Sequence, residues 1–245
     1  MATEEKVSGF FALTSPAILE YPNVIDAKRF KGKNGKEKGD PKFSATVVLD
    51  PDGEDWKTAK AIITALAKQH VSSFDGIKFP HKSGDKVLAE LKAKFAAAGK
   101  EYDGRSDHLA GKIMIAAKSG LDIPPQLGIM GYDPKGNLLV NPDDKTRLVN
   151  GILALDDEGL KRKYKSKFYR GVGAFATLKF QWYDAVDDGK PGVTAYLVNV
   201  LSTGVGKNLG GARSVTEAFK GYAGKPSGES PSAGMDEDLD DELSL

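Results

Sequence analysis

The sequence predicts a mainly β (α+β) domain, a five-stranded Greek-key barrel with inserted helices and a disordered acidic C-terminal tail. Five segments show the two-residue alternation, or the β-branched and aromatic content, of strands. Two segments with apolar residues at every third or fourth position lie between the second and third strands, and they predict helices. The domain is predicted over residues 1–223, and a flexible linker with the acidic tail over residues 224–245.

The first two strands flank a basic segment. Residues 9–21 mix apolar and small polar residues with a proline, which is typical of an irregular or edge strand. Residues 26–41 are rich in glycine and lysine and predict a long mobile loop. Residues 42–49 alternate between apolar and mostly polar side chains, and therefore predict a strand with one buried face.

The helical insertion is predicted over residues 54–98. Its first helix, residues 54–72, begins with Glu54 and Asp55, which supply the acidic first turn that suits a helix amino terminus. Its second helix, residues 85–98, is followed by Gly99, a residue type that ends helices in the left-handed conformation. Both are expected to pack on the sheet.

Three strands are predicted after the helices. Residues 108–118 predict the third strand, and the proline- and glycine-rich chain after it predicts an irregular excursion with a turn at residues 133–137. Residues 168–186 and 193–202 predict the last two strands, joined as an antiparallel hairpin by the turn sequence DDGKPG. This order of elements is compatible with a Greek-key barrel of the OB type.

Charge is divided unevenly along the chain. The last ten residues carry six carboxylates and no base, whereas the preceding 235 residues carry 35 basic and 28 acidic side chains, a formal charge of +7. The six carboxylates belong to Asp236, Glu237, Asp238, Asp240, Asp241 and Glu242. A flexible polyanion beside a basic surface can occupy the place of a nucleic acid and be displaced by one.

Basic and aromatic residues are interleaved in residues 161–170, which read KRKYKSKFYR. Because bases neutralise phosphates and rings offer flat surfaces for stacking, this pattern predicts contact with a nucleic acid. The alternative is an ordinary basic face whose rings belong to the core. Six bases between residues 28 and 38 predict a second, flexible phosphate-binding segment, or else a solvated loop without a partner.

The strand predicted over residues 168–186 has two distinct faces. One face is continuously apolar and predicts the core; it comprises Val172, Ala174, Ala176, Leu178, Phe180 and Trp182. The other face, with Phe175, Lys179 and Tyr183, is too polar for a core and rich in rings, as expected of a stacking platform. A bulge at a glycine would exchange the faces, and the rings would also fit under a helix or at an oligomer interface.

Several functional classes find little support in the sequence. There is no cysteine, and the three histidines fit neither an HExxH zinc helix nor a ligand cluster, so no metal or cofactor site is predicted. Clustered carboxylates such as Asp143, Asp144, Asp156 and Asp157 leave a magnesium-dependent nuclease as an alternative. A signal peptide and a membrane-spanning apolar run are lacking, which predicts a soluble intracellular protein.

Four parts of the chain resemble the OB-fold single-stranded DNA-binding proteins of tailed bacteriophages. They are the run KFYRGVGAFATLKFQWYD, the continuation at residues 187–211, the early strand GFFALTSPAILEYP and the acidic end. The resemblance implies binding of single strands in phage DNA replication, recombination and repair, in the cytoplasm of the infected bacterial host. It also implies an acidic tail that contacts replication or recombination proteins and competes with DNA. Related tails commonly end in an aromatic residue, whereas this one ends Leu-Ser-Leu, with Leu239, Leu243 and Leu245 as candidate anchors.

The sequence therefore predicts a non-enzymatic, sequence-independent binder of single-stranded DNA. The alternatives are the nuclease and a basic protein-interaction or virion component, and both a homodimer and RNA binding are left open. The candidate DNA-binding residues are Tyr164, Lys165, Lys167, Tyr169, Arg170, Phe175, Lys179, Tyr183, Lys28, Arg29, Phe30, Lys31 and Lys33.

Overall fold

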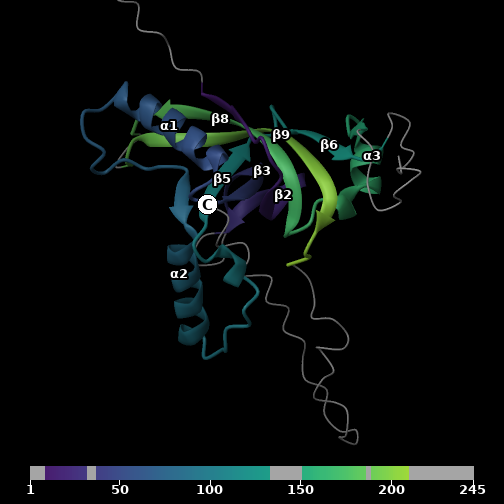
Figure 1. Ribbon diagram of the computed structural model, residues 1–245, viewed down its shortest axis with the longest axis horizontal. Coiled ribbons are helices and arrows are strands. Elements are labelled where there is room, and N and C mark those ends of the chain that lie inside the picture. Colours follow the sequence, from purple (N-terminus) through teal and green to yellow (C-terminus); the bar gives the residue numbers. More distant parts are fainter. Residues whose placement is uncertain (1–8, 32–36, 133–150, 186–188, 210–245) are drawn as a thin grey trace, which may run out of the picture.

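Five strands close into a barrel in the computed structural model, which describes residues 9–31, 37–132, 151–185 and 189–209 (Figure 1). The barrel strands are β2 (Ala17–Lys31), β3 (Glu37–Leu49), β5 (Ile113–Ser119), β8 (Val172–Tyr183) and β9 (Gly192–Gly206). Their order is β8, β2, β3, β5, β9, and the barrel closes because β9 also pairs with β8. The predicted OB-type fold is confirmed, as is the hairpin of the last two barrel strands.

The helical insertion also lies where the sequence predicts it, between β3 and β5. Helix α1 (Glu54–Lys68) and helix α2 (Gly84–Ala97) are separated by the short strand β4 (His81–Ser83), which pairs with β5. The apolar face of α1, with Trp56 and Ile63, packs into the barrel core. No helix in the described part of the chain is long and apolar enough to cross a membrane.

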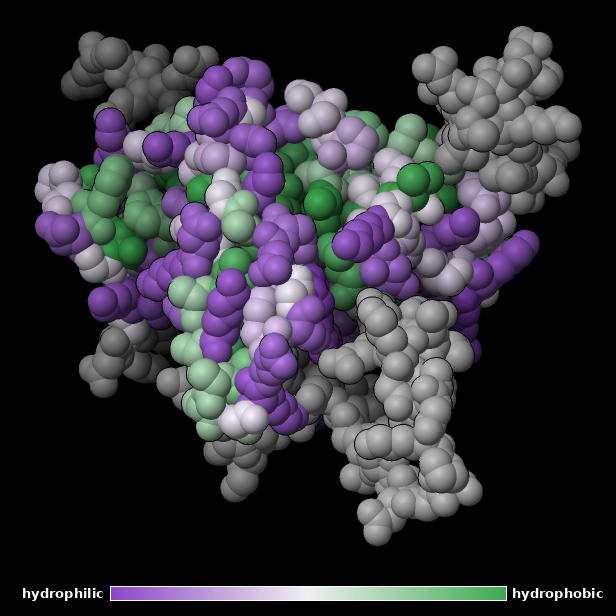
Figure 2. Space-filling view, turned by 60° about the horizontal axis from the view of Figure 1, so that its bottom comes forward, coloured by the Kyte–Doolittle hydropathy of each residue, from purple (hydrophilic) through white to green (hydrophobic). Residues whose placement is uncertain are grey.

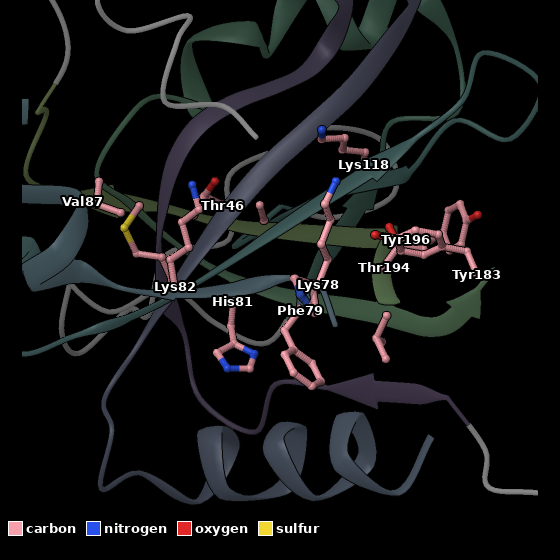
Figure 3. Close-up of a pocket in the computed structure, with 14 residues that line it drawn as sticks. Thr46, Lys78, Phe79, His81, Lys82, Val87, Lys118, Tyr183, Thr194 and Tyr196 are labelled. Atoms are coloured by element: carbon pink, nitrogen blue, oxygen red, sulfur yellow. The ribbon is translucent and has the colours of Figure 1, made fainter. Parts of the chain in front are cut away.

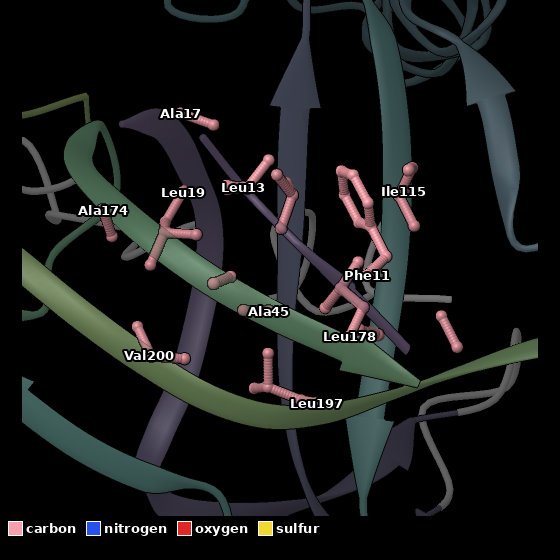
Figure 4. Packing of buried hydrophobic residues seen from close by; sticks show 14 of the residues in the cluster. Phe11, Leu13, Ala17, Leu19, Ala45, Ile115, Ala174, Leu178, Leu197 and Val200 are labelled. Carbon is pink, nitrogen blue, oxygen red and sulfur yellow. The ribbon is translucent and has the colours of Figure 1, made fainter. Parts of the chain in front are cut away.

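The core fills the barrel with the apolar residues that the alternation in β8 predicts. Val172, Leu178 and Phe180 are almost completely buried. Figure 4 shows Leu178 among buried residues of the other barrel strands, such as Leu197. Burying a side chain of this size contributes about 1.5–3 kcal/mol relative to leaving it exposed. On the outer face shown in Figure 2, hydrophilic side chains predominate and apolar residues form separate patches between them.

The prediction of a long mobile loop over residues 26–41 is largely wrong. Strand β2 continues to Lys31 and β3 begins at Glu37, so most of this segment forms a two-stranded antiparallel arm. The arm has mostly polar side chains on both faces, so that no apolar alternation marks it in the sequence. Residues 32–36, between the two strands, lie outside the described residues.

Three further boundaries differ from the sequence predictions. The first predicted strand is two strands, β1 (Phe10–Ala12) and the start of β2, with Pro16 in the chain between them. The third begins only at Ile113, because the chain before it forms a short 3-10 helix, Asp107–Leu109. The predicted irregular excursion contains β6 (Gln126–Met130), which pairs in parallel with β9. Strand β7 (Ile152–Ala154) lies beyond the excursion and pairs with β6. The turn predicted at residues 133–137 lies outside the described residues.

Helix α3 (Glu158–Lys163) contains the start of the basic segment that leads into β8. Its amino terminus is capped by Asp157, whose Oδ1 accepts a hydrogen bond of 2.9 Å from the backbone N–H of Leu160. A short 3-10 helix, Lys165–Lys167, follows α3 within the basic segment.

Candidate nucleic-acid interface

A groove of about 750 Å³ lies on the outer face of the barrel, beside the place where β5 and β9 meet. Lys118 of β5 and Tyr196 of β9 are paired in parallel register there, and residues 78–83 run alongside both strands. The N–H of Lys78 donates to the carbonyl of Pro191 (3.0 Å), and the N–H of Val193 donates to the carbonyl of Lys78 (2.9 Å). The inserted segment is thus fixed to the barrel and forms one wall of the groove.

Side chains in residues 78–83 alternate between two sides of the segment, and the lysines point into the groove. Lys78 and Lys82 point toward the side of Lys118, whereas Phe79 and His81 point toward α1 (Figure 3). The ring of His81 lies 5.5 Å from that of Phe79 and also contacts an aromatic ring of α1. Packing of one side of the segment therefore sets the direction of the cations on the other side.

Two tyrosines line the opposite end of the groove. Tyr196 projects from the outer face of β9 with 42% of its surface exposed, and Tyr183 is half-buried at the end of β8. Figure 3 places both rings beside Thr194. The groove thus combines flat ring faces with cations, the two features that unpaired nucleotides need for stacking and for phosphate contacts.

The charge of the groove is positive. Three of its lining residues are lysines, and none of the described residues that line it is acidic. Burial lowers the pKa of Lys118, and the positive charge of Lys42 lowers it further. Burial, followed by the charge of Lys60, also lowers the pKa of His81, which is therefore neutral at pH 7. Partly desolvated ammonium groups attract a phosphate more strongly than fully hydrated ones.

Two of the predicted DNA-binding residues are instead buried. Tyr164 is only 7% exposed and packs edge-on against Tyr132 in the core. Arg170 is also 7% exposed; its Nε lies 2.6 Å from a carboxylate oxygen of the fully buried Glu20, and it donates to Ser106 (2.7 Å). Neither residue lies on the open contact surface that the sequence predicts, and this is a correction. The interleaved pattern does not distinguish rings and bases that are buried in a core from those that face a ligand.

The rest of the predicted segment lies outside the groove, partly beside the β2–β3 arm and partly beside the end of β9. Lys165 forms an ion pair with Asp26 of β2, which brings the two predicted basic segments together. Lys167 is half-buried, and the half-buried Tyr169 donates its hydroxyl to the carbonyl of Gly206 (2.9 Å). In the first basic segment, Lys28 and Arg29 are exposed on β2. The side chains of Phe30 and Lys31, the whole of Lys33 and the acidic tail lie outside the described part of the structure.

The predicted platform on β8 has its two faces as expected, without an exchange at a glycine. Phe175 is half-buried beside Leu201 of β9, and Lys179 is exposed on the same outer face. Tyr183 is the predicted site residue that lines the groove. The basic and aromatic residues that the sequence predicts as DNA contacts are therefore divided between the groove, the outer face of β8, and the region of the β2–β3 arm and the end of β9.

A family model described as the ssDNA-binding protein of Enterobacter phage Enc34 matches residues 12–230 of this chain. The chain belongs to this family. The match spans the barrel and its inserted helices, and it agrees with the resemblance to phage single-stranded DNA-binding proteins found in the sequence. No curated protein matches the chain.

Solved structures of phage proteins are similar to this member of the Enc34 family. The single-stranded DNA-binding protein from bacteriophage Enc34 in complex with ssDNA has a TM-score of 0.50 and 17% identity, covering 85% of this chain and 97% of that one. Another structure of the single-stranded DNA-binding protein from bacteriophage Enc34 has a TM-score of 0.48 and 16% identity, covering 89% of this chain and 97% of that one. The single-stranded DNA-binding protein gp2.5 of bacteriophage T7 has a TM-score of 0.37 and 10% identity, covering 81% and 93%. The Enc34 complex thus shares the fold.

Four groove residues of this family member escape the sequence prediction. Lys118 and Tyr196 occupy outward positions of alternating strands, so a parity count in those strands is the signal that finds them. Lys78 and Lys82 lie in a short segment with no apolar period, and their position depends on its pairing with β5 and β9.

No group of three or more His, Asp or Glu side chains within the described residues is arranged to hold a metal ion. Asp157 serves as the cap of α3, and Asp143 and Asp144 lie outside the described residues.

Proposed function

We propose that this chain binds single-stranded DNA independently of sequence, with the groove as the principal site. Its lysines neutralise phosphates, and Tyr183 and Tyr196 stack on bases. The observation that carries the proposal is that three lysines and two tyrosines from distant parts of the chain line one open groove without an acidic neighbour among its described lining residues. Stacking ignores base identity, since every base has a flat face, and it therefore gives affinity without sequence preference.

The position of the groove supports the same function. OB folds bind oligonucleotides on the face of the second and third barrel strands, next to the loops after the first and fourth strands. In this barrel those strands are β3 and β5, and both supply lining residues, as does Tyr183 at the end of the fourth strand. Membership of the Enc34 family and the ssDNA in the similar Enc34 structure add support.

We further propose that the protein acts in phage DNA replication, recombination and repair in the cytoplasm of the infected host, and that it is not an enzyme. Its tail carries six carboxylates in ten residues. We infer that this polyanion competes with DNA for the basic surface and recruits replication or recombination proteins.

The function is tested by titrating fluorescent oligo(dT) with the full chain and with Tyr196→Ala. Loss of one stacking ring is expected to weaken binding by about 5- to 150-fold, since a stacked base contributes about 1–3 kcal/mol. Ile152→Ala is the control, because Ile152 is also an exposed apolar residue, 57% exposed, and does not line the groove. A duplex of the same length is expected to bind more weakly, because paired bases do not reach the rings.

Three outcomes would contradict parts of this proposal. Degradation of the oligonucleotide after magnesium is added would identify a nuclease. Absence of binding at moderate salt would favour a protein-interaction or virion role. Unchanged or weaker binding after deletion of the last ten residues would exclude competition by the tail.

A further inference from the structure

A row of alternating cations and rings leaves the groove and crosses the outer face of the barrel. Lys118 of β5 is the register partner of Tyr196 in β9, and Tyr196 is that of Lys179 in β8. Lys179 is in turn the partner of Phe10 in β1, a strand outside the five-stranded barrel. Cross-strand partners point to the same face of a sheet, so these four residues form one continuous row, called here the cross-strand row.

Phe10 is the most exposed ring of this row. Its side chain is 54% exposed, although an exposed large apolar ring is unfavourable in water. The ammonium group of Lys179 lies 5.6 Å from the centre of the Phe10 ring, within cation–π range. The ring therefore has a cation beside it and an open surface, the same combination as the tyrosines and lysines of the groove.

The outward direction of Phe10 is fixed by its neighbour. Phe11 is 4% exposed and stacks on Phe180 in the core, with ring centres 6.1 Å apart. The N–H of Phe180 donates to the carbonyl of Gly9 (2.7 Å), and a side chain at Gly9 would collide with the carbonyl of Phe180. Since neighbouring strand residues point to opposite faces, anchoring Phe11 inward holds Phe10 outward.

The length of the cross-strand row suits an extension of the groove. Four strands at the usual separation of about 4.8 Å span about 14 Å, which is about four nucleotides at the 3.4 Å spacing of one strand in a duplex. A strand that leaves the groove over Tyr196 would meet Lys179 and then Phe10 without turning away from the sheet.

We propose that Phe10 is a base-stacking residue, and that single-stranded DNA continues from the groove across β9 and β8 to β1, with Lys179 contacting a phosphate on the way. The proposal rests on the proposed function and extends it. It assigns β1 a binding role in addition to its structural one, and it sets one limit of the binding site at Phe10.

The test measures the affinity of the full chain and its Phe10 variants for an oligo(dT) series that grows one nucleotide at a time. Phe10→Ala is expected to bind the shortest members like the parent and the longest about 5- to 150-fold more weakly. Phe10→Tyr should retain parent affinity, whereas Phe10→Leu, which keeps an apolar side chain on β1 without a ring, should behave like Phe10→Ala. Ile152→Ala is the control for removal of an exposed apolar side chain elsewhere.

Each other outcome overturns the proposal or the function beneath it. If Phe10→Ala or Phe10→Leu binds every length like the parent while Tyr196→Ala is weakened, Phe10 does not stack and only the extension fails. If Phe10→Ala and Phe10→Leu lose the same factor of affinity for every oligonucleotide length, Phe10 stabilises the groove and does not contact an additional nucleotide. If the parent chain binds no oligonucleotide, the proposed function itself fails.

Discussion

Removing the groove lysines should change how strongly DNA binding depends on salt. The variant combines Lys78→Gln, Lys82→Gln and Lys118→Gln, which keep a polar side chain in each place but delete three positive charges from the groove. Because glutamine is polar and uncharged, it is compatible with these partly exposed positions, and the fold is expected to persist. The change therefore isolates electrostatics from the shape of the barrel.

The size of the effect follows from the number of phosphates that the groove can neutralise. Each contact with a single strand contributes a slope of about −0.7 to log K against log salt concentration, because it releases condensed counterions. If each of the three lysines contacts one phosphate, the slope of the variant should be shallower by about 2. Lys118 is expected to contribute strongly, since its partial burial leaves it less screened.

Fluorescence anisotropy with oligo(dT) at several salt concentrations measures this slope, and circular dichroism checks the fold. The control combines Lys57→Gln, Lys68→Gln and Lys92→Gln on α1 and α2, which removes the same charge from exposed residues that do not line the groove. Its slope should stay close to that of the parent. The reasoning is refuted if the groove variant keeps the parent slope and affinity, or if the control loses as much slope as the groove variant.

Two further predictions concern stability. Arg170→Met should lower the free energy of unfolding by up to about 3–5 kcal/mol, because the fully buried Glu20 loses its guanidinium partner and keeps the ring of His108 at 2.6 Å; urea denaturation measures this, and a loss below about 1 kcal/mol would contradict it. Asp55→Asn should cost about 1–3 kcal/mol at pH 7. Burial alone would raise the pKa of Asp55, but hydrogen bonds from Thr14 and Ser15 outweigh it and hold the pKa below the ordinary 3.8. The charged carboxylate therefore stabilises the fold above that value and ceases to do so as the pH falls through the folded-state pKa, so the cost should shrink below about pH 4; equal costs at pH 7 and pH 3 would exclude this origin.

Local pattern was enough to predict the parts of the fold whose residues alternate between water and core. In β8 the alternation identifies Leu178 and Phe180 as buried and Lys179 as exposed, and the spacing in α1 identifies Trp56 and Ile63 as its buried face. The same patterns gave the order of barrel strands and inserted helices. They succeed because burial of one face repeats at the period of the backbone itself.

Pairing between distant segments decided the functional surface. The sequence pattern at residues 161–170 does not distinguish one base from another, yet Arg170 is buried against Glu20 while Lys165 is exposed. That difference depends on which residues other elements bring opposite them, and no local period records it. Burial of a charge is tolerated only with a partner, and the partner of Arg170 comes from β2.

Composition and periodicity are enough to predict a mainly β barrel with inserted helices, a basic body and an acidic end, because both depend only on residues that are close in the chain. The meeting of Lys78 and Lys82 with Lys118 and Tyr196 in one groove could be found only in the folded protein. Those residues meet because residues 78–83 pair with β5 and β9, and hydrogen bonds between backbones carry no signature in the side chains that they bring together.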